Sequence, residues 1–150
     1  MINSTREWDW MDRWMDLRSK FEEYGRIETS NKYKQGVDIR YKTERYPKNT
    51  NGVYILTDGD DTVKIGNSTC IRKRFDILYK HVRNSTNDKI RAYVKEEAYL
   101  NIWVYPVETI TREILDALVQ YTPIDGLERH VIDTYTEAHG ALPYLNSGRM

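Results

Sequence analysis

Residues 52–75 read GVYILTDGDDTVKIGNSTCIRKRF, and this stretch decides the fold. Large side chains follow one another along 53–56, so both faces of the first strand carry them, as in a mostly buried central strand. Asp58-Gly59 is a strong hairpin signal, because Gly tolerates positive φ and Asp can hydrogen-bond to its own backbone. The stretch therefore predicts a strand, a tight turn, an antiparallel second strand and the start of a helix.

Two polar side chains stand among the aliphatic residues of this hairpin. Tyr54 lies in the first strand and Lys64 in the second, so pairing across the turn can bring both to one face. Gly66 ends the second strand at a point where a side chain would obstruct a close approach. Arg74 follows on a helix that we expect to pack against the hairpin. One short unit thus gathers a phenol, an amine and a guanidinium.

In these residues the chain resembles the GIY-YIG nuclease family. The triplets GVY at 52–54 and KIG at 64–66 correspond to the two family motifs, with Val for Ile and Lys for the second Tyr. Arg74 falls where the family has its Arg. Glu128, in a Leu-Glu pair on a later predicted helix, matches the metal-binding Glu, and Asn146 matches the late Asn that follows a Pro.

The resemblance covers residues 52–146 and implies an α+β fold, a small antiparallel three-stranded sheet flanked by helices. Residues 52–150 would be the catalytic domain. Residues 1–51 would be an N-terminal helix and basic arm, including a strand, that serves DNA recognition or dimerisation. The implied activity is hydrolysis of DNA, as in small restriction or phage endonucleases. The alternative is a DNA-binding module of the same fold that does not cut.

The resemblance also assigns roles to five residues. Glu128 would bind Mg²⁺ or Mn²⁺, Arg74 would contact phosphate oxygens, and Asn146 would fix backbone or substrate near Glu128. Tyr54 would be the general base, although a free phenol has a pKa near 10 and needs a cation such as Lys64 beside it. A neutral Lys64 could instead take the proton, and the sequence leaves both possibilities open.

One position departs from the family pattern. The family often has His or Tyr one turn after the Arg, and this chain has Leu78 there. Tyr79 or His81 could take over that role.

The net charge is zero, but the charges are unevenly distributed. Residues 72–95 hold eight Lys or Arg against two Asp, whereas residues 101–150 hold three basic against seven acidic side chains. A basic face can meet a phosphate backbone even when the total charge is neutral, although most charge runs are only solvated surface. The side chains that we expect to bind double-stranded DNA are Arg40, Lys42, Arg72, Lys73, His81 and Arg83.

Periodicity predicts the other elements. We expect an amphipathic helix over 4–24 capped by Gly25 and an exposed strand over 37–42. A helix should run from Ser68 or Thr69 to about Val82, and its spacing turns Ile71, Phe75, Leu78 and Val82 toward the core. A helix capped by Asp88, with Lys89, Arg91 and Lys95 outward, follows, and then a strand over 99–107. Further helices are expected over 111–119 and from Pro123.

Other features place the chain among ordinary cytoplasmic proteins. No apolar run approaches the roughly 18 residues of a membrane helix, and no signal peptide is visible. Cys70 is the single cysteine, which excludes an internal disulfide and suits a reducing cell interior, bacterial or phage-infected. Double-strand cutting needs two active sites, so we expect a homodimer, with the aromatic stripe of 8–24 as a possible interface.

Overall fold

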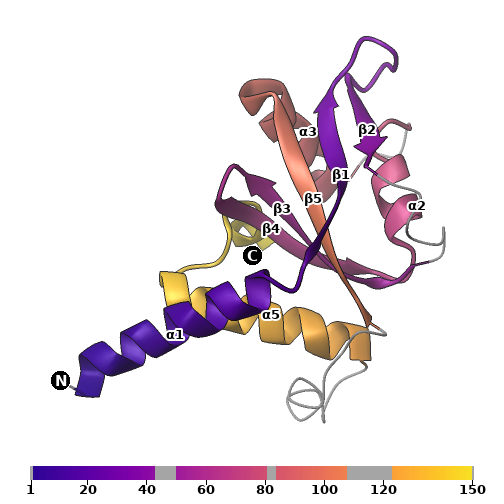
Figure 1. Ribbon diagram of the computed structural model, residues 1–150. Coiled ribbons are helices and arrows are strands. Elements are labelled where there is room, and N and C mark those ends of the chain that lie inside the picture. The colour runs from indigo at the N-terminus through magenta and orange to yellow at the C-terminus, as the bar shows by residue number, and fades with distance from the viewer. Residues whose placement is uncertain (1, 43–49, 81–83, 108–122, 150) are drawn as a thin grey trace.

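The computed structural model describes residues 2–42, 50–80, 84–107 and 123–149 (Figure 1). Its described strands form one antiparallel sheet in the order β2-β1-β5-β3-β4. The strands are β1 (Glu22–Thr29), β2 (Val37–Tyr41), β3 (Gly52–Asp58), β4 (Asp61–Ser68) and β5 (Tyr99–Pro106). The helices are α1 (Ile2–Arg18), α2 (Ile71–Asp76), α3 (Ser85–Glu97), α5 (Pro123–His139) and the 3-10 helix η2 (Tyr144–Arg149). The α+β class is confirmed.

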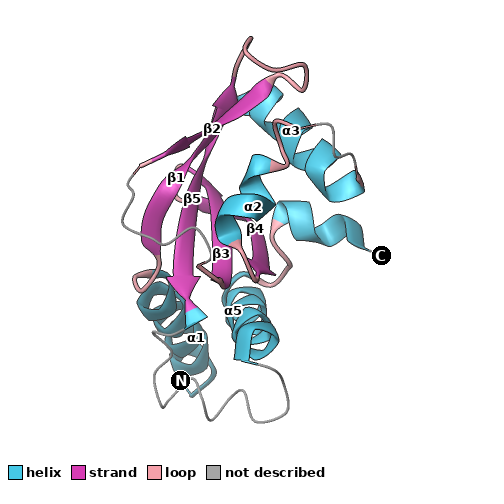
Figure 2. Ribbon diagram, turned by 90° about the vertical axis from the view of Figure 1, so that its right-hand side faces the viewer, coloured by secondary structure: helices cyan, strands magenta, loops and turns pink. Residues whose placement is uncertain are grey.

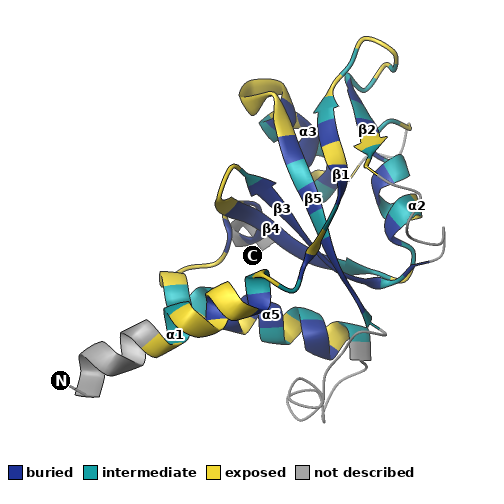
Figure 3. Cartoon of the chain, viewed as in Figure 1, coloured by how far each residue is buried: buried dark blue, intermediate teal, exposed yellow. Residues whose placement is uncertain are grey.

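Helices cover both faces of the sheet. Alternate side chains of β3 divide between two apolar clusters: Tyr54 and Leu56 pack toward α2 and α3, and Val53 and Ile55 pack toward α1 and α5. Figure 1 shows α1 and α5 side by side, and Figure 2 shows α2 and α3 on the other side of the strands. The continuous burial of β3, seen as dark blue in Figure 3, follows from this double cover.

The predicted hairpin is confirmed, and it contains one irregularity. Strands β3 and β4 pair through the turn at Gly59, whose φ is +59°. After two regular pairs the register shifts, so that Leu56 lies opposite Lys64 and Val63 is the extra residue of a β-bulge. Successive side chains of a strand point to opposite faces of the sheet. This single insertion therefore moves every following side chain of β4 to the face opposite the one it would occupy in a regular ladder. The bulge therefore turns Lys64 to the same face as Tyr54.

The N-terminal segment adds two strands to the predicted three. Strand β1 pairs with β5 on one side and with β2 on the other. The strand expected over 37–42 is confirmed as β2, which ends at Tyr41, but the helix expected over 4–24 ends at Arg18. Tyr24 and Gly25 instead lie in β1, so Gly25 is not a helix cap. Backbone pairing with two neighbouring strands outweighs the helical spacing of the aromatic residues.

Three residues of the aromatic stripe, Trp14, Leu17 and Phe21, belong to the core of this chain. Trp14 is 4% exposed and makes an edge contact with Tyr135 of α5, with ring centroids 5.0 Å apart. Leu17 is 5% exposed in the same cluster, and Phe21 packs edge-on against Tyr105 of β5. These side chains hold α1 against α5 and the sheet, so they are not available to a second subunit.

The segment between β4 and β5 differs from prediction at both helices. Helix α2 ends at Asp76, and three-residue backbone turns continue to Lys80, whereas one helix was expected to about Val82. Helix α3 begins at Ser85, because the side chain of Asn84, rather than that of Asp88, caps its first turn. The expected helix over 111–119 lies outside the described residues. Strand β5 confirms the strand expected over 99–107. None of the described helices has the length and apolar character of a membrane span.

Hydroxyl groups of two tyrosines tie the layers together. The Tyr41 hydroxyl on β2 donates to Asp76 at the end of α2, and the Tyr93 hydroxyl on α3 donates to Asp58 in β3 at 2.8 Å. Burial raises the pKa of both tyrosines above the ordinary value, and the hydrogen bond to a carboxylate raises it further. The fold therefore favours the neutral phenols.

This raised pKa predicts a loss of stability at alkaline pH. The stabilisation is fully present below the unfolded-state pKa near 10 and is lost as pH rises through the higher folded-state pKa values. We expect the urea midpoint of the wild-type protein to change little up to about pH 9 and to fall as the pH rises above about 10. Tyr41→Phe should show a smaller fall, because Phe does not ionise, whereas Tyr144→Phe, at a 68% exposed position, should behave as the wild type. Equal pH dependence in Tyr41→Phe and the wild type would contradict this account.

Candidate active site

A pocket of about 400 Å³ lies beside β4, where the two helical layers meet the edge of the sheet. Four of the five predicted catalytic side chains line it: Tyr54 of β3, Lys64 of β4, Arg74 of α2 and Glu128 of α5. They come from four elements and both faces of the sheet. The remaining lining residues are Ile65, Gly66, Asn67, Ile77, Asn84, Ser85 and Thr86.

Tyr54 reaches the pocket by crossing Gly66, its partner in the β3–β4 ladder. A Cβ at Gly66 would lie 2.4 Å from the Tyr54 hydroxyl oxygen and 2.5 Å from Cζ. The ring also packs edge-on against Phe75 at 4.9 Å, and the residue is 2% exposed. Gly66 is therefore required by the close approach of an aromatic ring, as the sequence predicted, although β4 itself continues to Ser68.

Lys64 is 7% exposed and faces the pocket from the strand next to Tyr54. The predicted placement of both side chains on one face is correct, and the Val63 bulge produces it. Burying a charged ammonium group is costly without anionic or polar partners. A charged Lys64 would also bring a compact positive charge into a confined space.

Arg74 adds a second cation from α2. Its guanidinium carbon lies 5.9 Å from the centre of the Tyr54 ring, and its Nη1 donates to the side-chain oxygen of Asn87 at 2.8 Å. The core-facing residues of the same segment, Ile71, Phe75 and Leu78, are fully buried, as their spacing predicted. This packing fixes the side of α2 from which Arg74 extends.

Glu128 approaches from the opposite layer. Its neighbours on α5, Leu127 and Val131, pack with Ile55 and Ile65 against the face of the sheet that Tyr54 does not use. Asp125, one turn earlier, accepts a 3.4 Å hydrogen bond from Asn67 at the end of β4. The half-buried Glu128 therefore meets the other three side chains around the outer edge of β4.

Asn146 lies beside this arrangement but is not among the residues that line the pocket. Its amide donates to the backbone oxygen of Ile65 at 2.9 Å and accepts from the backbone nitrogen of Ile65 at 2.8 Å. The residue is 1% exposed. These two bonds fix the outer edge of β4 between Lys64 and Gly66, which is the backbone part of its predicted role.

The four described residues among those predicted to bind DNA do not line the pocket. Arg40 contacts Glu28 at 3.1 Å and Lys42 contacts Glu23 at 2.5 Å, both on the neighbouring β1. The Arg72 guanidinium lies 4.1 Å from the centre of the Tyr41 ring, and Lys73 is exposed. His81 and Arg83 lie outside the described residues.

The open question after Leu78 is partly answered. Leu78 is fully buried, and Tyr79 stacks on Tyr33 with ring centroids 4.6 Å apart; neither is among the residues that line the pocket. Sequence reasoning missed the first turn of α3, because it began this helix only at Asp88. Asn84, Ser85 and Thr86 of that turn line the pocket. Asn84 as a capping residue was the available signal.

The chain can be compared with protein-family models, with curated proteins and with solved structures. No protein-family model matches it, and no curated protein matches it. The chain is similar to a solved structure of a mutant of bacteriophage T4 EndoII, with 19% sequence identity and a TM-score of 0.44. The similarity covers 62% of this chain and 70% of that chain.

Gly66→Ala tests the close approach of Tyr54. The added methyl group must displace a packed ring, so we expect a destabilisation of about 1–3 kcal/mol, measured by urea unfolding. Gly59→Asn is the control, because Asn tolerates the positive φ of the turn and no atom lies within 4 Å of the added Cβ. A Gly66→Ala protein as stable as the wild type would show that Tyr54 does not need this space.

Asn146→Ala tests the backbone clamp on β4. The change leaves the buried N–H and C=O of Ile65 without these partners, at a cost of about 1–3 kcal/mol per group. We expect a clearly lower urea midpoint than for Asn31→Ala, the same change at an exposed position. Equal midpoints for the two variants would rule out a structural role.

Proposed function

We propose that this protein is a metal-dependent DNA endonuclease that hydrolyses phosphodiester bonds in the pocket beside β4. The observation that supports this most is the gathering of Tyr54, Lys64, Arg74 and Glu128 in one pocket. A phenol, two cations and a carboxylate answer the needs of this reaction: a base for the attacking water, positive charge on the phosphate, and a ligand for a metal ion.

In this proposal Arg74 binds the non-bridging oxygens of the phosphate, since a guanidinium can offer two parallel N–H donors. Tyr54 takes the proton of the attacking water, and the nearby positive charge of Lys64 favours the phenolate that this requires. If Lys64 is itself the base, Tyr54 instead orients the water. In both versions the water oxygen bonds to phosphorus as the bond to the 3′ oxygen breaks.

Glu128 would hold the divalent ion, Mg²⁺ or Mn²⁺. Glu128 is the one carboxylate among the described residues that line the pocket, and no cluster of three or more His, Cys, Asp or Glu occurs in the described part of the chain. This donor set fits Mg²⁺, which binds through one or two carboxylates and completes its shell with waters and phosphate oxygens. When bound, the ion would stabilise negative charge on the phosphate and the leaving oxygen.

The proposed substrate is double-stranded DNA, cut at specific sites in the manner of a restriction or phage enzyme. The support is the resemblance of residues 52–146 to the GIY-YIG nucleases together with the basic residues of α2. Cutting both strands would need two such pockets, so the proposal includes a homodimer.

The experiment is nicking of supercoiled plasmid, with Mg²⁺ or with EDTA, by the wild type and Glu128→Ala. We expect Mg²⁺-dependent nicking that falls by about two orders of magnitude or more in Glu128→Ala. Glu137→Ala is the matched control, since Glu137 is exposed on the same helix, and it should cut as the wild type does.

Two results would overturn the proposal. One is nicking that Glu128→Ala leaves unchanged. The other is an absence of cutting combined with a salt-sensitive gel shift from both proteins, which would favour a DNA-binding module without catalysis.

A further inference from the structure

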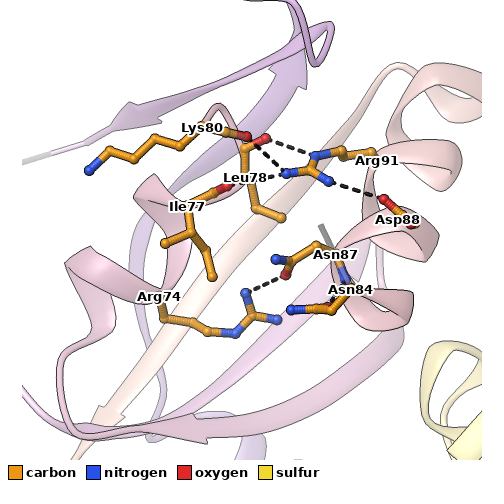
Figure 4. Close-up of polar contacts among 8 residues, drawn as sticks. All are labelled: Arg74, Ile77, Leu78, Lys80, Asn84, Asn87, Asp88 and Arg91. Carbon is orange, nitrogen blue, oxygen red and sulfur yellow. Dashed lines mark hydrogen bonds and ion pairs between the residues drawn. The ribbon is translucent and has the colours of Figure 1, made fainter. Parts of the chain in front are cut away.

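Helix α3 contacts α2 and the turns after it through two buried polar residues one helical turn apart, Asn87 and Arg91 (Figure 4). Both lie on the side of α3 that faces α2, and both are nearly inaccessible to solvent, Asn87 at 0% and Arg91 at 3%. The sequence predicted Arg91 to point outward with Lys89 and Lys95, and this was wrong. Buried polar residues in such pairs restrict how two elements can be placed.

Arg91 holds the end of α2. Its Nε donates to the backbone oxygen of Leu78 at 2.8 Å, and its Nη2 lies 3.2 Å from the oxygen of Ile77 and 3.3 Å from that of Lys80. The backbone after α2 leaves the helical path here, and the guanidinium satisfies the carbonyl groups exposed by the turn. This explains why α2 ends at Asp76 instead of continuing.

Asn87 holds the side chain of Arg74. Its amide oxygen accepts from Nη1 of Arg74 at 2.8 Å, while its backbone N–H donates to the side chain of Asn84 at 2.8 Å. The capped first turn of α3 thus fixes Asn87, and Asn87 binds one edge of the guanidinium. Because Arg74 lines the pocket, its other donors can remain directed at a ligand there.

The residue type at position 87 is informative. It is the third residue of α3, where the helix dipole tolerates a negative charge, so Asp is compatible with the helix end. Asp would also accept the hydrogen bond from Arg74. A carboxylate, however, would offset the positive charge of Arg74, whereas an amide oxygen orients the guanidinium and leaves its charge intact.

We propose that Asn87 is a positioning residue that fixes the orientation of Arg74 toward a phosphate in the pocket without neutralising its charge. This inference rests on the proposed function for the identity of the ligand. The proposal depends on two properties of Asn87: its oxygen accepts a hydrogen bond from Arg74, and its side chain is uncharged. Asn87→Ala removes the first property, and Asn87→Asp removes the second.

The first test follows Arg74 itself, in the full-length protein without DNA. Nitrogen-15 NMR of the arginine side chains, with Arg74 assigned through Arg74→Lys, reports whether rotation of the guanidinium is hindered. We expect separate Nη signals in the wild type and in Asn87→Asp, and averaged signals in Asn87→Ala. Averaged signals in the wild type would overturn the proposal, and a merely structural role for Asn87 predicts no such difference.

The second test asks whether the absence of charge on the side chain at position 87 matters for nicking. We expect Asn87→Asp to remain folded, because its carboxylate stays paired with Arg74, and to lower kcat/KM for plasmid nicking by about tenfold or more. Ala92→Asp, which adds the same charge at an exposed position of α3, should cut normally. A stable Asn87→Asp protein that nicks as fast as the wild type would overturn the proposal.

The two proposals can fail separately. If the wild type does not nick DNA under any condition, the endonuclease proposal fails, and duplex binding at fixed salt replaces nicking as the readout. Asn87→Asp should then bind a DNA duplex about tenfold more weakly than Ala92→Asp does, because Arg74 no longer presents its full charge. Equal binding by the two variants would overturn the role of Asn87.

Discussion

The extra residue in β4 is the constraint on which the arrangement of the pocket depends. With a regular ladder, Lys64 would lie opposite Ile55 and point toward α1 and α5. The bulge at Val63 places it opposite Leu56 instead, on the face that Tyr54 uses. The same shift puts Gly66 under the ring of Tyr54. A local irregularity of one residue therefore decides which chemical groups can meet.

The pocket depends equally on contributions from both layers of helices. Arg74 and the first turn of α3 lie on one face of the sheet, and Glu128 belongs to a helix packed on the other. They can meet only at the outer edge of β4, where the sheet ends and the layers approach each other.

Local patterns predicted what depends on neighbours in sequence. The hairpin turn at Gly59, the alternation of β5 and the core-facing residues of α2 could be read in advance. The bulge could not, because it is defined by how two strands pair.

The errors have the same physical origin. Tyr24 fitted a helical stripe, but backbone pairing with two strands took it into β1. Arg91 was expected at the surface. It is buried instead, because its guanidinium binds backbone carbonyl groups in the turns after α2. Asn87 was not predicted as a site residue for a related reason. Its side chain accepts a hydrogen bond from Arg74, thirteen residues away, and no sequence pattern indicates such a contact.

The amide of Asn146 also has a consequence for how this protein behaves among copies of itself. In the described part of the chain, β4 has a strand neighbour on one side only. An open strand edge is a template on which another chain can extend the sheet, which is a common route to aggregation. By occupying both backbone groups of Ile65, Asn146 imitates one residue of the missing strand and closes the middle of that edge. A single side chain thus opposes the addition of a further strand at the edge beside which the pocket lies.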